Sequence, residues 1–149
     1  MISVSRATKQ DLGAIRHLSA KYGNKLLIEE CLFNNRDIAI QARSSDGALI
    51  GFVWGGLMAS NQICYVDKVM VDPSASGLGV LAAMYKELFK IALRRGVKKA
   101  FGVIRQDQYH DKSAKGAMHM AWGADSLPYT LVNADLSHML KELEAHHGR

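Results

Sequence analysis

The chain has 149 residues, of which 48% are apolar and 22% are charged, and its formal net charge at pH 7 is +5. This balance is that of an ordinary soluble globular protein, and the length suits one domain over residues 1–149. The mild positive charge favours anionic partners such as phosphates, but it is too small to indicate a nucleic-acid-binding protein.

The cysteines, the N-terminal segment and the apolar runs exclude further classes of protein. Cys31 and Cys64 lie far apart and fit no metal-ligand spacing, so neither a disulfide framework nor a metal site is expected. Met1–Thr8 lacks the layout of a signal peptide, and the longest apolar run, Ile50–Ala59, is about half as long as a membrane-spanning helix. The sequence therefore predicts a cytoplasmic protein without a membrane partner.

The first part of the chain predicts one strand followed by two helices. Val4–Ala7 has the character of a short strand. A second helical stretch is expected from Leu26 to Phe33, ending near Asn34–Asn35. Between them, apolar residues recur at steps of three and four, which is typical of an amphipathic helix started by Asp11: Leu12, Ile15, Leu18 and Tyr22.

Three strand-like runs with short connections come next. They are Ile38–Ala42, Ala48–Met58 and Ile63–Val71, and turn residues separate them at Ser44–Gly47 and Ser60–Asn61. Because such short connections join antiparallel neighbours, the three runs predict an antiparallel sheet.

Beyond Pro73 the pattern becomes one of alternating helices and strands. An apolar stripe predicts a helix over residues 77–95 that Gly96 caps, and its members are Leu81, Met84, Leu88 and Ile91. The expected fold class is α/β, with a mixed sheet whose antiparallel N-terminal strands continue into a parallel pair around this central helix. Further elements are predicted as a strand, a helix, a strand and a polar, helix-prone tail at Val97–Ile104, Ser113–Trp122, Tyr129–Ala134 and His138–His147.

Two glycines before the central helix raise the question of a phosphate-binding loop. The segment Gly77–Ala82 satisfies the dinucleotide-binding pattern G-x-G-x-x-G/A. In a dinucleotide-binding unit, however, the first glycine follows the strand at once, whereas here Asp72–Ser76 intervenes and hairpin-like strands precede it. Dinucleotide binding is therefore disfavoured.

The run VDKVMVDPSASGLGVLAAMYKEL, residues 66–88, resembles the GCN5-related N-acetyltransferase (GNAT) family, as does the order of elements around it. In that family the amide N–H groups of a glycine loop and of the helix start bind the pyrophosphate of acyl-coenzyme A. The resemblance implies acetyl-coenzyme A as acyl donor, with a loop made of Gly77, Leu78, Gly79, Val80 and Leu81. It also implies that this strand splays from Phe101–Ile104, so that the pantetheine arm binds the backbone of Val69, Met70 and Val71.

Two departures from the family motif leave its register open. With the spacing kept from Pro73, Ser76 stands where the family has arginine or glutamine, and Leu81 stands where it has a small residue. A register shifted by two residues keeps both glycines but shortens the loop. Serine replaces the arginine or glutamine in either register, so one phosphate-binding side chain is lost while most amide donors remain.

Asp67 is the candidate general base. It lies six residues before Pro73, where the GNAT family often carries its catalytic glutamate. The alternative is that Asp67 lies at a splayed strand edge and pairs with a lysine or a backbone donor. Desolvation within an apolar row would raise the pKa of the Asp67 carboxyl, and strand alternation predicts such a row on one face from Tyr65, Asp67, Val69 and Val71.

The departing thiolate of coenzyme A needs a proton, and the resemblance places His119 where the family commonly has a tyrosine on the later helix. Histidine has an ordinary pKa near neutrality, so His119 is the candidate general acid, with a packing role as the alternative. Tyr109 and His110, in the preceding loop, are alternative donors.

The leading interpretation is an N-acetyltransferase in which a primary amine, entering beside residues 11–35, attacks acetyl-coenzyme A directly. The runner-up is a catalytically inactive GNAT-fold binding or structural protein, which the departures at Ser76, Leu81 and the missing tyrosine favour. The acceptor and the oligomeric state, a homodimer included, stay open. A nucleic-acid surface is disfavoured because no aromatic residues interleave the cations of one helix face, Lys86, Lys90 and Arg94.

Overall fold

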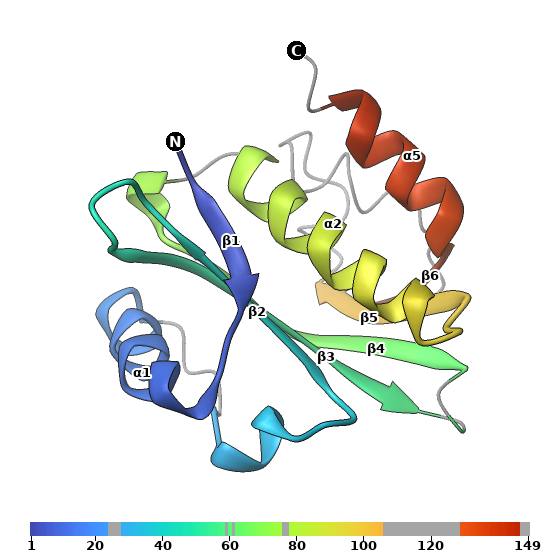
Figure 1. Ribbon diagram of the computed structural model, residues 1–149, viewed down its shortest axis with the longest axis horizontal. Coiled ribbons are helices and arrows are strands. Elements are labelled where there is room, and N and C mark those ends of the chain that lie inside the picture. Colours follow the sequence, from blue (N-terminus) through green and yellow to red (C-terminus); the bar gives the residue numbers. More distant parts are fainter. Residues whose placement is uncertain (24–27, 59, 61, 76–77, 106–128, 147–149) are drawn as a thin grey trace.

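The computed structural model describes the chain except for residues 24–27, 59, 61, 76–77, 106–128 and 147–149. In the described residues, six strands form one sheet and three α-helices pack on it (Figure 1). In chain order the elements are β1 (Ser3–Arg6), the 3₁₀ turn η1 (Lys9–Asp11), α1 (Leu12–Lys21), η2 (Glu30–Phe33), β2 (Ile38–Arg43), β3 (Leu49–Met58), β4 (Ile63–Val71), η3 (Pro73–Ala75), α2 (Leu78–Arg94), β5 (Lys99–Arg105), β6 (Tyr129–Asp135) and α5 (Leu136–His146).

The strands lie in the sheet in their chain order, from β1 to β6. Every neighbouring pair is antiparallel except β4 and β5, which run parallel. Parallel neighbours need a crossover connection, and α2 provides it. The predicted α/β fold, with antiparallel N-terminal strands continuing into a parallel pair around a central helix, is confirmed.

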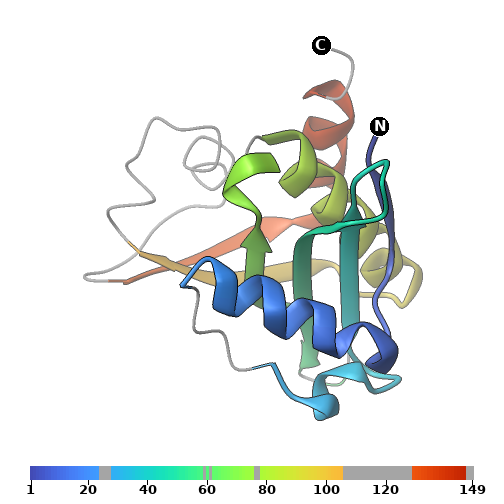
Figure 2. The same cartoon turned by 90° about the vertical axis from the view of Figure 1, so that its left-hand side faces the viewer.

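The sheet separates two layers of helices. α2 and α5 cover one face, whereas α1 and η2 cover the other (Figures 1 and 2). Strand alternation produces this division: Ile38 and Ile40 of β2 join the core beneath α2, while Ala39 between them joins the core beneath α1. β2 is therefore buried on both faces.

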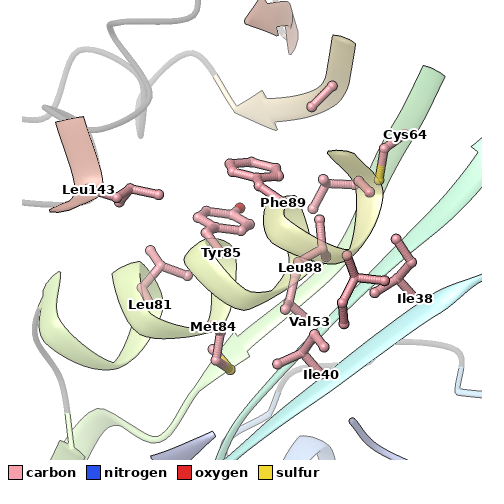
Figure 3. Packing of buried hydrophobic residues seen from close by; sticks show 14 of the residues in the cluster. Ile38, Ile40, Val53, Cys64, Leu81, Met84, Tyr85, Leu88, Phe89 and Leu143 are labelled. Atoms are coloured by element: carbon pink, nitrogen blue, oxygen red, sulfur yellow. The ribbon is translucent and has the colours of Figure 1, made fainter. Parts of the chain in front are cut away.

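α2 packs closely on the sheet because two strand positions opposite it are glycines. A Cβ atom on Gly51 would stand 2.9 Å from Sδ of Met84, and one on Gly55 would stand 3.3 Å from Cδ1 of Leu88. Met84 and Leu88, two members of the predicted apolar stripe, are fully buried against the strands (Figure 3). This packing fixes the position of α2 over β3.

α2 ends at the predicted glycine cap. Gly96 has a φ of 81° and donates its N–H to the carbonyl of Leu93 at 2.9 Å, while Val97 donates to the carbonyl of Ala92 at 3.1 Å. These two bonds form the left-handed cap that glycine favours at a helix C-terminus. Val97 belongs to the cap, so β5 begins at Lys99 rather than at the predicted Val97.

Two other predicted helices differ from the structure, and one lies outside it. In the stretch 26–33, the described residues form only the four-residue turn η2, because Glu29 before it has an extended backbone. Asn34 ends the turn, and its Oδ1 accepts the N–H groups of Arg36 and Asp37. The helix predicted at Ser113–Trp122 lies outside the described residues. The C-terminal segment is not a polar tail, since α5 buries an apolar face in the core beneath α2 through Leu136, Met139 and Leu143.

Candidate functional site

A β-bulge interrupts β4 at Asp67. Two consecutive residues of β3 pair with Val66 and Lys68, so Asp67 is an extra residue without an opposite partner on β3. The bulge reverses the alternation of the strand, because Val66 before it and Val69 after it both contact the core beneath α2. The predicted common face is therefore wrong, since it assumed unbroken alternation through Tyr65, Asp67, Val69 and Val71.

The Asp67 carboxylate lies at the surface of the bulge. Its side chain is 38% exposed, and Oδ2 lies 2.5 Å from Nζ of Lys68. The lysine is only 16% exposed, and its ammonium stands 6.0 Å from the centre of the Trp54 ring. Trp54 in turn donates Nε1–H to the carbonyl of Leu32 in η2 at 2.9 Å. The predicted apolar surroundings of Asp67 are thus absent, and the alternative pairing with a lysine is observed.

β4 and β5 separate beyond the bulge. Their parallel pairing runs from Ile63 opposite Lys99 to Val66 opposite Gly102. It ends there, although β4 continues for five more residues and β5 for three. Both C-terminal ends lie within the described backbone, and no ladder joins them. The splaying implied by the family resemblance is present, and it begins after Gly102.

The phase of hydrogen bonding decides which backbone groups of β4 point into this opening. Asp72 donates its N–H to the carbonyl of Ile50 on β3 at 2.8 Å, which places Met70, two residues earlier, among the residues that bond to β3. The N–H and C=O groups of Val69 and Val71 therefore point away from β3, toward the opening. Of the three predicted pantetheine-binding residues, these two present backbone groups there and Met70 does not.

The first turn of α2 follows the end of β4 and η3. The first four N–H groups of a helix lack intrahelical partners and form its positive end. In α2 these include the N–H groups of Leu78, Gly79 and Val80. Gly79 is exposed, and no heavy atom lies within 4 Å of where its Cβ would stand. Val80 and Leu81 are buried, and Leu81 points toward Leu143 of α5 (Figure 3), so its side chain does not cover Gly79.

Several predicted site residues lie outside the described residues. Gly77 of the loop and His119, the candidate acid, are among them, as are Ser76 and the alternative donors Tyr109 and His110. Their roles stay predictions from the sequence.

The sequence pattern did not single out Asp72, although it is one of the few buried polar residues of the described core. Its carboxylate accepts hydrogen bonds from Ser74 and from Tyr22, which is 50 residues away in the sequence. An acidic residue between Val71 and Pro73 was the only local signal. A partner so distant in sequence leaves no periodic pattern.

The sequence matches the family model described as the acetyltransferase (GNAT) family over residues 10–114. A comparison with curated proteins gives no significant match. Among solved structures, the fold is similar to the ribosomal-protein-S18-alanine N-acetyltransferase of Escherichia coli, with 14% identity and a TM-score of 0.69. That likeness covers 89% of this chain and 91% of the other.

Two further structures show the same likeness of fold. The PaiA N-acetyltransferase of Thermoplasma acidophilum, solved with coenzyme A, gives 11% identity and a TM-score of 0.68 over 91% of this chain and 99% of that one. The spermidine N-acetyltransferase of Vibrio cholerae, solved with coenzyme A and spermine, gives 10% identity and a TM-score of 0.70 over 93% and 98%. No described helix of the present chain combines the length and apolar character needed to cross a bilayer. By its family match and its fold, the chain belongs to the GNAT acetyltransferase family.

Proposed function

We propose that this protein is an N-acetyltransferase that transfers the acetyl group of acetyl-coenzyme A to a primary amine by direct attack. The observation that carries the proposal is the opening between β4 and β5 beside the first turn of α2. An acyl-coenzyme A donor needs hydrogen-bonding partners for its amide-bearing arm and donors for its diphosphate. The opening offers partners for the arm, and the helix turn offers donors for the diphosphate.

The described residues fit such a donor in two ways. Val69 and Val71 direct backbone donors and acceptors into the opening, where they match the amide groups of a pantetheine arm. The amides at the start of α2 suit a diphosphate, because an anion at a helix N-terminus meets unpaired N–H groups and the positive end of the helix dipole. Gly79 adds no side chain between this turn and solvent, so a phosphate can approach the backbone.

Asp67 is the group we assign to proton removal. An alkylamine is mostly protonated at neutral pH and must lose a proton before it attacks. The exposed carboxylate of Asp67 lies at the bulge, next to the opening, and accepts that proton directly or through a water molecule. Bound acetyl-coenzyme A supplies the activated thioester. The amine nitrogen bonds to the acyl carbon and releases its remaining extra proton to water, the carbon–sulfur bond breaks, and the thiolate takes a proton from His119 or from water.

The acceptor enters on the face of the sheet that carries α1 and η2. The opposite face is filled by the core beneath α2, whereas Asp67, Lys68 and Trp54 lie on the η2 side of the bulge. The proposal keeps the cytoplasmic location and the amine acceptor expected from the sequence.

A transfer assay with labelled acetyl-coenzyme A tests the proposal. The acceptor panel contains a peptide with an N-terminal alanine, a polyamine and an aminoglycoside, and both thiol release and the mass of the acetylated amine are measured. We expect amine-dependent transfer, with Asp67→Asn lowering kcat by about 10²- to 10⁴-fold, the usual contribution of a general base. The control Asp46→Asn, in the turn between β2 and β3, leaves kcat unchanged.

Thermal denaturation with coenzyme A separates this proposal from the inactive alternative. A ligand that binds only the folded state must raise the melting temperature. A rise with coenzyme A but no acetylation of any amine supports a GNAT-fold binding protein. No rise at millimolar coenzyme A contradicts the donor site itself.

A further inference from the structure

Asp72 has every polar group engaged at the point where the chain passes from β4 toward α2. The residue as a whole is only 6% exposed. Its N–H bonds to Ile50 on β3 at 2.8 Å, and its carbonyl accepts the N–H of Ala75 at 3.0 Å. Oδ1 accepts both the N–H and the hydroxyl of Ser74, at 2.8 and 2.7 Å. These bonds hold η3 against the end of β4.

The second carboxylate oxygen makes a long-range contact. Oδ2 of Asp72 accepts the phenolic hydroxyl of Tyr22 at 2.8 Å. Tyr22 is the C-terminal cap residue of α1, and its ring packs against the core beneath that helix. One buried carboxylate therefore joins the end of the acceptor-side helix to the segment that leads into α2.

This contact is not needed to hold α1 on the sheet. The buried residues Leu12, Ile15 and Leu18 already anchor the helix in the core that it shares with β2 and β3. Ser74 alone would satisfy one carboxylate oxygen within a local turn. The Tyr22 hydroxyl adds the one described side-chain hydrogen bond between α1 and the segment 72–75.

We propose that Asp72 is a positioning residue that couples the two sides of the site. Through Tyr22 and Ser74 it ties the end of α1 to the approach to α2, so that coenzyme A binding at the start of α2 also orders the end of α1. The inference rests on the proposed function, because it assumes that the start of α2 receives coenzyme A. Coupling of this kind is reciprocal. The factor by which coenzyme A favours the ordered end of α1 equals the factor by which that order tightens coenzyme A binding, so a change that loosens the end of α1 must weaken the binding.

Tyr22→Phe tests the coupling with the loss of one hydroxyl group. We expect its Kd for coenzyme A, measured by calorimetric titration, to rise about 3- to 10-fold. This is less than the roughly 10- to 100-fold effect of losing a direct hydrogen bond to a charged group, because Tyr22 acts on coenzyme A only through Asp72. Asp72→Asn keeps the shape of the side chain and should raise the Kd as well. Because both substitutions act on the same contact, Asp72→Asn by removing its charge and Tyr22→Phe by removing its hydroxyl, the double variant should show less than the product of the two single effects.

Thr8→Val is the matched control. It also removes one hydroxyl-to-carboxylate hydrogen bond, of 3.1 Å to Asp11, but at the opposite end of α1. A purely structural role would make Thr8→Val and Tyr22→Phe alike, with lower stability and an unchanged Kd for coenzyme A. Hydrogen exchange gives a second readout: coenzyme A should slow exchange of the amides of residues 18–22 in the wild type and not in Tyr22→Phe.

The outcomes separate the inference from the proposed function. A wild-type protein that binds coenzyme A, with a Tyr22→Phe variant of equal affinity and equal exchange protection, overturns the coupling and leaves the proposed function standing. A wild-type protein without affinity for coenzyme A overturns both. A raised Kd in Tyr22→Phe with an unchanged Kd in Thr8→Val supports the inference.

Discussion

Replacing Gly79 with alanine should stabilise the protein and at the same time weaken coenzyme A binding. Gly79 is the second residue of α2, its φ lies outside the left-handed region, and no heavy atom lies within 4 Å of the added Cβ. Because alanine loses less backbone freedom on folding, a Gly→Ala change at a compatible helical position stabilises by about 0.5–1 kcal/mol. For a chain of this size that corresponds to a rise in Tm of roughly 1–4 °C.

The effect on binding has the opposite sign. If the diphosphate of coenzyme A lies against the amides of this turn, the new methyl group occupies its path. Losing one hydrogen bond to a charged group costs about 1.5–3 kcal/mol, which is roughly a 10- to 100-fold rise in the Kd for coenzyme A. Without ligand, the variant should therefore have a higher Tm than the wild type. Added coenzyme A should raise the Tm of the variant by less than it raises the Tm of the wild type.

Gly13→Ala is a closely matched control. Gly13 is the second residue of α1, and its Cβ position is equally free of neighbours within 4 Å. The same gain in Tm is expected, with an unchanged Kd for coenzyme A. Scanning calorimetry and calorimetric titration measure both quantities. A Gly79→Ala protein that binds coenzyme A as tightly as Gly13→Ala would refute the placement of the diphosphate at α2.

Three further predictions concern the core and its polar contacts. Cys31 is exposed, whereas burial raises the pKa of the Cys64 thiol to about 12, so a thiol reagent should label one cysteine in the native protein and two in urea. Hydrogen bonds from the Ser74 hydroxyl and, to a smaller degree, from Tyr22 lower the pKa of the Asp72 carboxyl below its ordinary value of 3.8. The stability that this carboxylate contributes is therefore fully present above pH 3.8 and is lost as the pH falls through the folded-state pKa. Urea denaturation should accordingly show Asp72→Asn to be less sensitive to acid than the wild type. Leu88→Ala, at a fully buried position against β3, should lower the free energy of unfolding by about 2–5 kcal/mol, and equal stability would contradict the described packing.

The strands and the central helix follow from patterns that the sequence displays locally. Short polar turns between Ile38–Ala42, Ala48–Met58 and Ile63–Val71 are enough to predict antiparallel neighbours, and the structure has them. The three- and four-residue spacing of apolar residues in α2 and the glycine after it predict both its buried face and its end. Each of these signals lies within one element or in the short turn beside it, so each can be recognised without knowing how the elements pack.

The bulge at Asp67 could not be predicted in the same way. A period of two assumes that every residue has an opposite partner, and the extra residue depends on how β4 pairs with β3. The alternation therefore assigned the wrong neighbours to Asp67. The contact of Tyr22 with Asp72 was equally hidden, because it joins two elements through the folded sheet. In α5, starting the element at His138 missed Leu136, the first residue of its apolar face.

The most direct test of the account is an NMR titration of isotopically labelled protein with coenzyme A, following the backbone amides of β4 and α2. We predict the largest shifts at Val69, Val71 and Gly79, with smaller ones at Met70, whose amide faces β3. Saturable shifts at the three sites would place the donor between β4 and β5 with its diphosphate at the start of α2. Shifts confined to other parts of the chain, or none at millimolar coenzyme A, would contradict that placement.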